Sequence, residues 1–439
     1  MPTSTQRSNG GSASVTVADA RSDATRSATP RSSLAPPPDN SVGRAVAGWL
    51  FPVYLMLILV GFPLLRIPGM TRSGNELNGF QAMFTAVNAA TLTGFQQGAG
   101  VDSFLLPGQI VVFCLIVAGS MLSLIIGGMA AVRVLKLGYS DRRIAIGTGF
   151  AQVIMLAAGT LFLSFDTHRT IWSSLFLSAA AFGNCGMLVG SLPNAAGWQT
   201  HLVLLPMMTL GGLGLPVLLE LWDRLFQRRL LSSHSRVALG MAAWLFVAGT
   251  LLLLVVRLVS TPLADESTNT FIEAIARSAC LCVNARTTGL PWERLDQLSM
   301  ATVPLLMLLI AIGGATAGAA GGIKTTTFFQ LGRGLHQLWK GINPGRVMTV
   351  AAVTVGCYVL AVALASTLLL YALPERAPVQ MIFNAFSAVS NCGLSFAAVE
   401  KSAAEYYILA GAMITGRLGS LTLLWWLADS TQQAEVAVA

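Results

Sequence analysis

Four short segments combine an apolar helical pattern with an ending of small or polar residues, a glycine and an apolar residue. They read FTAVNAATLTGF, FLSAAAFGNCGM, ACLCVNARTTGL and FNAFSAVSNCGL, and their glycines are Gly94, Gly186, Gly289 and Gly393. The glycines lie roughly a hundred residues apart, and each segment stands between two long apolar stretches. Backbone that leaves a helix inside a bilayer is tolerated only where it is buried in protein or lines a polar path. The pattern therefore predicts four half-helices whose turns surround one ion pore.

The chemistry of such turns is that of backbone carbonyl oxygens. Carbonyl dipoles replace the water shell of an alkali cation without trapping the ion, and glycine allows the backbone angles that aim them inward. The C-terminal end of each half-helix also carries a partial negative charge, which favours cations. Since the four sequences differ, we expect carbonyls rather than side chains to carry selectivity, at Thr91, Leu92, Thr93, Gly94, Gly183, Asn184, Cys185, Gly186, Arg286, Thr287, Thr288, Gly289, Ser390, Asn391, Cys392 and Gly393.

The composition requires a membrane for this chain. Its 439 residues are 54% apolar and 10% charged, with a mean hydropathy of +0.67, which exceeds that of ordinary soluble proteins. A helix needs about 20 apolar residues to cross the hydrocarbon core. Eight stretches approach that length and predict an all-α integral membrane protein with both termini on one side: Trp49–Leu65, Leu105–Val132, Ile144–Phe165, His201–Leu221, Val237–Val259, Met300–Ile312 with its continuation, Val347–Leu370 and Tyr406–Leu427.

The net charge of +8 indicates orientation. Basic residues concentrate in three loops, at residues 133–143, 224–236 and 333–346, so the positive-inside rule places these loops and both termini in the cytoplasm. The charges form no single patch, which argues against nucleic-acid binding. The six cysteines lie in apolar or half-helix segments, so no disulfide framework is expected. No histidine pairs with cysteine or carboxylate at ligand spacing, and we assign no metal site beyond K⁺ in the turns.

The chain divides into four units of helix, half-helix with glycine turn, and helix. We place them at residues 46–143, 144–236, 237–345 and 346–430, between a disordered cytosolic tail at 1–45 and a short tail at 431–439. In the third unit the second helix is interrupted by GGATAGAAGGIKTTTF, and glycines this dense cannot sustain a straight helix. We expect an intramembrane gate loop at residues 313–324. The alternative is a small-residue helix-packing surface.

A few charged and thiol side chains stand inside apolar segments. Arg417, in the middle of the last span, is expected to face the pore below the turns and limit ion passage, or else to bond structurally to carbonyls of a neighbouring turn. Lys324 is either a gating charge or an inward-facing positive residue. Arg286 is expected to be a strut rather than an ion contact. Cys185 and Cys392 are expected to support the turns, with a two-cysteine metal site as the alternative. The predicted gate comprises Gly313, Gly314, Gly318, Gly321, Gly322, Lys324 and Arg417.

Several motifs together resemble the membrane subunit of the Ktr/Trk/HKT potassium transporters, most nearly the Ktr branch. They are TLTGF, GGLGLPVLLEL, RLLSSHSRVAL, VNARTTGL, AGAAGGIKTTTF and MITGRLGSLTLL, within residues 45–428. The resemblance implies four pseudo-symmetric helix–pore loop–helix repeats around a central pore, a homodimer, and a cytosolic ring that binds nucleotides. It also implies potassium transport, often sodium-dependent, gated by the broken helix. The gate loop departs from the family pattern in having more Ala and fewer hydroxyls.

The predicted function is potassium uptake across the plasma membrane, the inner membrane of a bacterium. Potassium is favoured over sodium because all four turns end in glycine, whereas in the plant-related branch a serine at the first turn goes with sodium. A sodium- or proton-coupled potassium symporter and a sodium-permeable relative stay open. An enzyme is not expected, since no hydrolase, metalloprotease or P-loop motif occurs in a plausible context. No cofactor is expected in this chain; nucleotide sensing is assigned to a separate cytosolic subunit that docks on the three basic loops.

Overall fold

Helices form all the regular secondary structure in the described part of the chain, residues 40–72, 74, 76–97, 100–260, 268–399 and 402–429 of this computed structural model. The first two predicted units contain α1 (Asn40–Leu64), α2 (Gly79–Ala90), α3 (Leu106–Leu135), α4 (Asp141–Leu163), α5 (Ile171–Gly183), the π-turn η2 (Thr200–Leu204), α6 (Leu205–Leu213) and α7 (Leu215–Gln227). The other two contain α8 (Ser233–Ser260), α9 (Thr268–Arg286), α10 (Thr302–Ala311), α11 (Thr325–Trp339), α12 (Gly345–Ala372), α13 (Pro378–Val389) and α14 (Ala403–Asp429). Short 3₁₀ turns occur at Val101–Ser103 and Leu295–Gln297.

Local sequence explains where several of these helices begin and end. The side chains of Ser140 and Thr170 accept hydrogen bonds from backbone amides in the first turns of α4 and α5. Prolines occupy the first turn of α3, α6, α7 and α13, where no amide donor is needed. The predicted tails at 1–45 and 431–439 lie outside the described residues, except for 40–45, where α1 begins.

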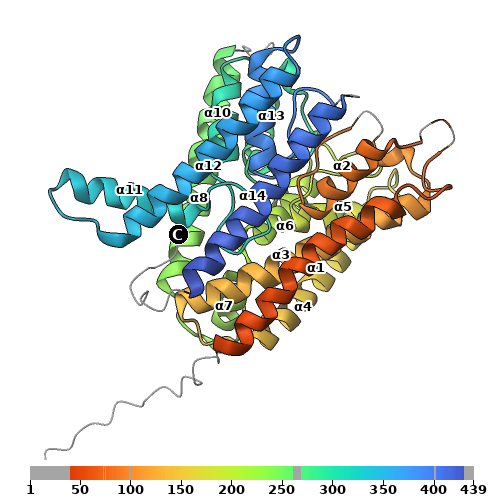
Figure 1. The fold of residues 1–439 in the computed structure, drawn as a ribbon. Coiled ribbons are helices and arrows are strands. Elements are labelled where there is room, and N and C mark those ends of the chain that lie inside the picture. Colours follow the sequence, from red (N-terminus) through yellow and green to blue (C-terminus); the bar gives the residue numbers. More distant parts are fainter. Residues whose placement is uncertain are drawn as a thin grey trace, which may run out of the picture. The chain divides into compact units, whose positions relative to one another are not determined.

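The helices that end at the turns, α2, α5, α9 and α13, each pack against the helix before and the helix after them in their own unit. Contacts between units follow one rule: α3 packs on α5, α6 on α9, α10 on α13, and α14 on α2. The helix that follows the short helix in each unit thus meets the short helix of the next unit, and the fourth unit returns to the first. Figure 1 shows α1, α3 and α4 side by side, with α14 crossing toward α2. The four units therefore close into a ring.

Glycines on the long helices allow the short helices to approach closely. A Cβ added to Gly119, Gly211 or Gly416 would overlap the carbonyl oxygen of Ala90, Phe182 or Val389, respectively. Each of those carbonyls lies four residues before the glycine that ends its turn. The same contact therefore recurs in the first, second and fourth units, and it sets the depth at which each short helix ends.

Two long apolar stretches are broken, one of which the sequence did not predict. The expected span His201–Leu221 is two helices that meet at 109°, because Gly214 between them has φ +84° and ends α6. A Cβ on Gly214 would lie 2.7 Å from the carbonyl carbon of Ala317, so the Gly-rich segment of the third unit fills this bend. The break in the third unit itself falls between α10 and α11, as the sequence indicates.

Length and composition allow fewer independent spans than the eight predicted. Among the described residues α3, α4, α8 and residues Met348–Ala372 of α12 could each cross a membrane alone, and the bent α6–α7 pair would be a fifth span. The apolar helices Pro52–Leu64, Ile171–Gly183, Thr302–Ala311 and Pro378–Val389 are shorter. The all-helical class agrees with the prediction, whereas the eight-span count stays a prediction.

Replacing Gly119 by alanine should destabilise the protein by about 1–3 kcal/mol, the usual cost of an overpacked core. The added methyl would overlap the Ala90 carbonyl oxygen and lie 3.1 Å from its carbon. The matched control is Gly149→Ala in α4, where no atom lies within 4 Å of the new Cβ. That variant should be neutral or more stable, since alanine favours a helix by about 0.8–1 kcal/mol. Thermal unfolding in one detergent measures both, and equal midpoints would contradict the close-packing argument.

Candidate ion pathway

The four predicted turns meet one another at their glycines. A Cβ added to Gly186 would lie 2.7 Å from the carbonyl oxygen of Gly94 and 2.9 Å from that of Gly289. Added to Gly289, it would overlap the Cys392 carbonyl oxygen and lie 2.8 Å from Leu394 N. Added to Gly393, it would lie 2.8 Å from the carbonyl carbon of Gly94. Each turn therefore touches the next, and the contacts run from the first turn through the second, third and fourth back to the first.

The turns adopt backbone conformations that explain part of their sequence. Gly94, Gly289 and Gly393 have φ of +90°, +68° and +89°, in the left-handed region that glycine enters at no steric cost. Asn184 and Asn391 also have positive φ, at +53° and +48°, and asparagine is among the few other residues that adopt it readily. All five residues are buried. The turns are thus fixed by backbone requirements as well as by packing.

Two asparagines that the sequence analysis did not single out support the first and third turns. The Oδ1 of Asn88 accepts hydrogen bonds from Gly94 N (2.7 Å) and Phe95 N (3.0 Å), and its Nδ2 donates to Phe95 O (2.9 Å). Asn284 makes the equivalent pair of bonds with Leu290, through Leu290 N (2.8 Å) and Leu290 O (2.7 Å). An amide inside an otherwise apolar half-helix was the signal that could have identified both.

The second and fourth turns are supported differently. Asn184 donates through Nδ2 to the carbonyl of Met208 in α6 (2.8 Å), and Asn391 donates to the carbonyl of Met413 in α14 (2.9 Å). Asn391 also donates to Thr93 Oγ1 in the first turn (3.0 Å). The supports therefore alternate around the ring, so the fourfold arrangement of backbones has only twofold symmetry in its side chains.

The hydroxyls of the predicted lining are bonded within the protein. Thr91 and Thr287 donate to carbonyls of their own short helices, four residues back, at 2.7 Å each. Ser390 Oγ lies 2.7 Å from the hydroxyl of Tyr358 in α12. The expectation that backbone oxygens rather than hydroxyls coordinate an ion stays a prediction.

The two cysteines of the turns do not lie against each other through their thiols. The thiol of Cys392 donates to the carbonyl of Ala285 in the third unit (3.1 Å), and Cys185 is a buried free thiol. No group of three His, Cys, Asp or Glu side chains suited to a metal ion occurs in the described ranges. Support of the turns by these two cysteines stays a prediction.

Gln96, which follows the first turn, is a further residue that the sequence analysis missed. Its Nε2 donates to the carbonyl oxygens of Gly186 (2.8 Å) and Gly94 (3.3 Å), so one amide bridges two neighbouring turns. Its place directly after the Gly–Phe pair was the available signal.

The Gly-rich loop (residues 313–324) lies against the turns and the α6–α7 bend. The amides of Ala315 and Ala319 donate to the carbonyls of Gly212 and Gly211, each at 2.9 Å. A Cβ on Gly321 would overlap the Ser390 carbonyl oxygen at the start of the fourth turn. The loop is thus held by backbone hydrogen bonds, which compensate for its few hydroxyls.

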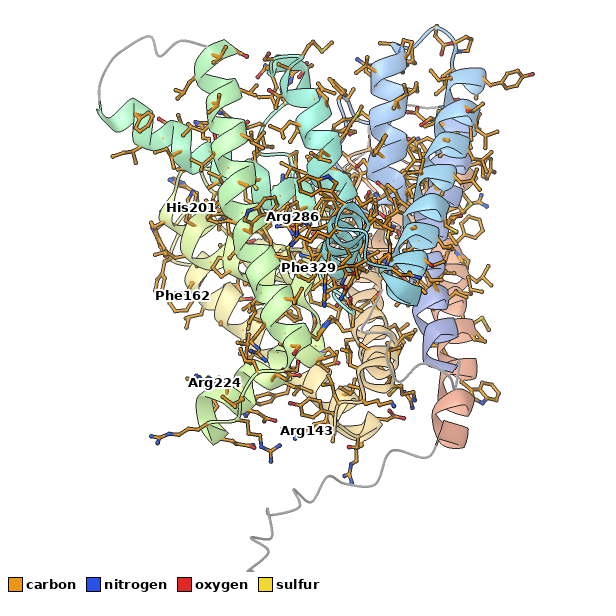
Figure 2. All side chains as sticks on the ribbon, turned by 90° about the vertical axis from the view of Figure 1, so that its left-hand side faces the viewer. Arg143, Phe162, His201, Arg224, Arg286 and Phe329 are labelled. Atoms are coloured by element: carbon orange, nitrogen blue, oxygen red, sulfur yellow. The ribbon has the colours of Figure 1, made fainter. Side chains whose placement is uncertain are left out.

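Three cationic side chains bind carbonyls of this loop or of the turns. Arg417 donates to the carbonyl of Thr91 through Nε (2.9 Å) and Nη2 (2.7 Å), and to that of Ala319 through Nη1 (2.6 Å). Arg286 donates to the carbonyls of Ile312 (3.2 Å) and Gly313 (3.1 Å), where α10 gives way to the loop. In Figure 2 Arg286 lies midway along the helices.

Lys324, at the end of the loop, donates to the carbonyl of Ala320 (2.8 Å). The structure therefore brings the predicted gate residues into one cluster with the first and fourth turns. Arg417 bonds to a carbonyl of the first turn and to a carbonyl of the loop at once, and its role in limiting ion passage stays a prediction.

Comparison with known proteins gives relatives that cover most of the chain. The potassium/sodium uptake protein NtpJ of Enterococcus hirae is 27% identical over 87% of this chain and 92% of its own length. The Ktr system potassium uptake protein B is 27% identical in Vibrio alginolyticus and 26% in Bacillus subtilis, over 85% and 86% of this chain and 90% and 92% of those proteins. No protein-family model matches the chain.

A solved structure shares the fold. The potassium transporter TrkH of Vibrio parahaemolyticus superposes with a TM-score of 0.63 at 17% identity, over 86% of this chain and 85% of that one. Together these findings confirm the resemblance to Ktr- and Trk-type membrane subunits, including the Ktr branch, that the motifs indicated. They also confirm that the chain is not an enzyme, since these relatives are uptake proteins and transporters.

Replacing Asn88 by alanine should loosen the first turn. The change leaves the amides of Gly94 and Phe95 without their buried acceptor, at a cost of about 1–3 kcal/mol per unsatisfied group. Hydrogen–deuterium exchange measured on the peptide spanning the turn should therefore be faster than in the unsubstituted protein. Asn343→Ala is the control, because Asn343 accepts one exposed bond from Gly345 N. Unchanged exchange at the turn in the Asn88 variant would argue against its supporting role.

Proposed function

We propose that this protein takes up potassium across a membrane through the ring of four glycine turns. The observation that carries the proposal is the closure of the ring: the backbones of Gly94, Gly186, Gly289 and Gly393 approach one another from four different units of the chain. Lipid-facing turns would have no reason to converge. Potassium is the ion named for NtpJ, for both Ktr proteins and for TrkH.

Carbonyl oxygens perform the selection in this proposal. The short helices α2, α5, α9 and α13 all end at the ring, so their partially negative C-termini point toward it and favour a cation. A cation in the ring exchanges water for backbone oxygens that the asparagine side chains hold in place. The supports at Asn88 and Asn284 act on the same turns whose oxygens would coordinate the ion.

The Gly-rich loop is the proposed gate. It lies directly against the fourth turn at Ser390, and the amide bonds to Gly211 and Gly212 hold it there. Arg417 connects the loop to the first turn through Ala319 and Thr91. Opening requires these bonds to exchange partners, and a positive charge just below the turns opposes the passage of a cation until the loop moves.

Sodium permeation is the second candidate function. It rests on the relative NtpJ, which is named as a potassium/sodium uptake protein. We interpret glycine at all four turns as favouring potassium over sodium. Coupling of potassium transport to sodium or protons remains the alternative mechanism. Flux measurements with each ion alone and with both together distinguish the three.

We propose that a separate cytosolic nucleotide-binding subunit regulates this chain. We also propose that the chain forms a homodimer in the bacterial inner membrane, on which that subunit docks. Figure 2 shows Arg143 and Arg224 at one end of the helices, on the proposed cytosolic side. Asp223 of α7 accepts a hydrogen bond from Arg143 (2.7 Å) and another from Tyr139 (3.0 Å), so part of the basic character is neutralised internally. Burial and the neighbouring Asp223 carboxylate raise the pKa of Tyr139, which keeps its phenol protonated as the donor.

The charges left for a docking partner are the exposed ones of the three basic loops. They are Lys136, Arg142, Arg224, Arg228, Arg236, Arg333 and Lys340, whereas Arg229 lies 4.0 Å from the Asp223 carboxylate and pairs with it. An acidic surface on the partner would complement them.

The purified chain in proteoliposomes should take up potassium in preference to sodium, and Gly94→Ser should reduce that preference. Gly94 has φ +90° and touches Gly186, so a side chain there displaces the carbonyls of two turns. We expect a loss of about tenfold in the potassium/sodium ratio, equivalent to roughly 1.4 kcal/mol of discrimination. Ion fluxes at clamped voltage measure the ratio.

Gly149→Ser is the control for that measurement, because its Cβ would meet no atom within 4 Å. An unchanged ratio in Gly94→Ser would refute the assignment of the filter.

Nucleotide added to vesicles that contain the chain alone should not alter uptake. A nucleotide response without any partner would contradict the separate regulatory subunit.

Replacing Arg417 by glutamine should increase potassium flux. The change removes a positive charge and three hydrogen bonds that join the loop to the first turn. Hydrogen bonds to charged groups contribute about 1.5–3 kcal/mol, so a flux increase of about tenfold or more is expected. Arg417→Lys, which keeps the charge, should show a smaller increase. The exposed Arg294→Gln serves as the control, and wild-type flux in a folded Arg417→Gln protein would rule out the gating role.

A further inference from the structure

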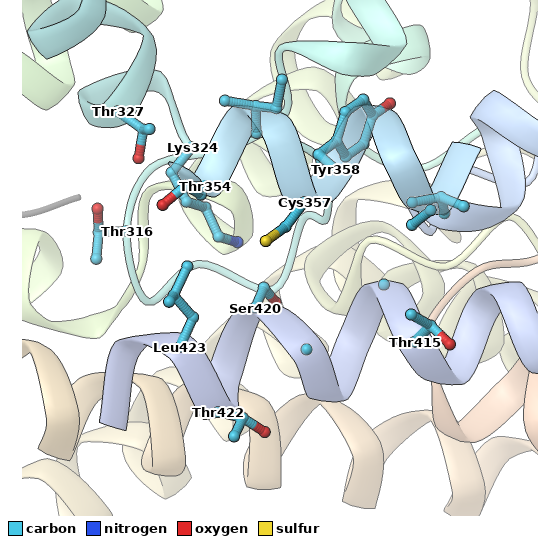
Figure 3. Close-up of a pocket in the computed structure, with 16 residues that line it drawn as sticks. Thr316, Lys324, Thr327, Thr354, Cys357, Tyr358, Thr415, Ser420, Thr422 and Leu423 are labelled. Atoms are coloured by element: carbon cyan, nitrogen blue, oxygen red, sulfur yellow. The ribbon is translucent and has the colours of Figure 1, made fainter. Parts of the chain in front are cut away.

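A cavity beside the Gly-rich loop has a volume of about 560 Å³, within the range of about 300–1,000 Å³ typical of small-molecule sites. On one side of the cavity lie the end of the loop and the start of α11. On the other side lie helices α12 and α14 of the fourth unit. Figure 3 shows Lys324 extending into this space from the loop side, with Cys357 of α12 and Ser420 of α14 on the walls. It is separate from the ring of glycines, none of which lines it.

Most polar groups of the cavity wall are already bonded within the protein. The hydroxyls of Thr354, Thr415 and Thr422 donate to carbonyls four residues back in their own helices. Ser420 bonds to the carbonyl of Arg417, and Tyr358 bonds to Ser390. These walls therefore present mainly carbon to the cavity.

The loop end of the cavity differs from these walls. Thr327 is fully buried and lines the cavity, yet its Oγ1 has no hydrogen-bond partner among the described residues. The ammonium of Lys324 has three donors, and one of them binds the Ala320 carbonyl. Unused hydrogen-bonding capacity is thus concentrated at one end of a space whose other walls are apolar.

The charge at this end has no anionic counterpart. In the described ranges neither Lys324 nor Arg417 forms an ion pair with a carboxylate; both donate to backbone carbonyls. A cation in apolar surroundings normally has an anionic partner or faces water. The cavity therefore suits a ligand with an anionic head at Lys324 and Thr327 and an apolar body against α12 and α14.

We propose that this cavity binds a single-chain anionic amphiphile, a long-chain fatty acid, whose carboxylate pairs with Lys324. A fatty acid brings one chain to this one apolar cavity beside Lys324, whereas a phospholipid brings two. Bound there, it connects the end of the Gly-rich loop to α12 and α14 and restrains the loop. The effect on transport rests on the proposed function, whereas binding itself does not.

Cys357 provides a direct test of binding, because it lines the cavity and is an exposed thiol. In phosphatidylcholine vesicles, oleate should slow labelling of Cys357 by a lipid-soluble maleimide at least about tenfold, the protection expected when the oleate concentration is about ten times its Kd. Cys114, an exposed thiol on α3, is the internal control and should label at an unchanged rate. Peptide-resolved mass spectrometry reads both sites in the same sample.

Variants and ligand analogues test the charge requirement. Lys324→Met should abolish protection by oleate, Lys324→Arg should retain it, and oleyl alcohol should protect far less than oleate. Equal protection in Lys324→Met, or equal protection of Cys114, would overturn the site. Protection by phosphatidylglycerol in the absence of oleate would overturn the single-chain occupant and indicate a lipid headgroup instead.

The last test measures potassium uptake with and without oleate. Oleate should lower potassium uptake by the unsubstituted protein, whereas Cys357→Trp, which fills the cavity, should be insensitive to oleate. Protection of Cys357 without any potassium flux would leave the binding site standing and refute the proposed function. Potassium flux without protection of Cys357 would leave the proposed function standing and refute the binding site.

Discussion

Close approach between backbones, which a single methyl group would prevent, is the constraint on which the rest of this structure depends. At the ring, a Cβ on any of the four turn glycines would collide with the backbone of a neighbouring turn. On the long helices, Gly119, Gly211 and Gly416 admit the carbonyls at the ends of three short helices. Because carbonyls and amides inside an apolar layer must find partners, these approaches also limit where the backbone of each turn can lie.

The hydrogen bonds around the turns occupy some of the turn carbonyls. The Thr91 carbonyl is taken by Arg417, and the Gly94 and Gly186 carbonyls are bridged by Gln96. The asparagine supports alternate between neighbouring units, so the four walls of the ring are held with different stiffness. A pore made from one chain can differ among its walls, whereas a homotetramer has four identical ones.

The loop of the third unit contacts turns that belong to other units. It bonds to the α6–α7 bend, abuts the fourth turn and reaches the first turn through Arg417. Three of the four units therefore hold the loop, and none of the contacts involves a described carboxylate. A cationic cluster held only by carbonyl dipoles would attract an anion that reached it, and the proposed amphiphile in the adjoining cavity rests on this property.

The sequence alone determined the class, the four turns and the position of the broken helix. Apolar length requires helices in a membrane, glycine at a fixed distance from a half-helix requires a turn, and a dense run of glycines from Gly313 cannot continue a helix. These are local properties, and local sequence carries them.

Only the tertiary structure decided what each turn contacts. Asn88 and Asn284 look like isolated polar residues until the chain folds back six residues later. From the sequence, residues 201–221 looked like one ordinary span. The bend at Gly214 could not be foreseen, because the loop that fills it lies a hundred residues away in the sequence. The partners of Arg417 come from the first and third units. Contacts between distant units depend on how the ring closes, and no local pattern encodes that closure.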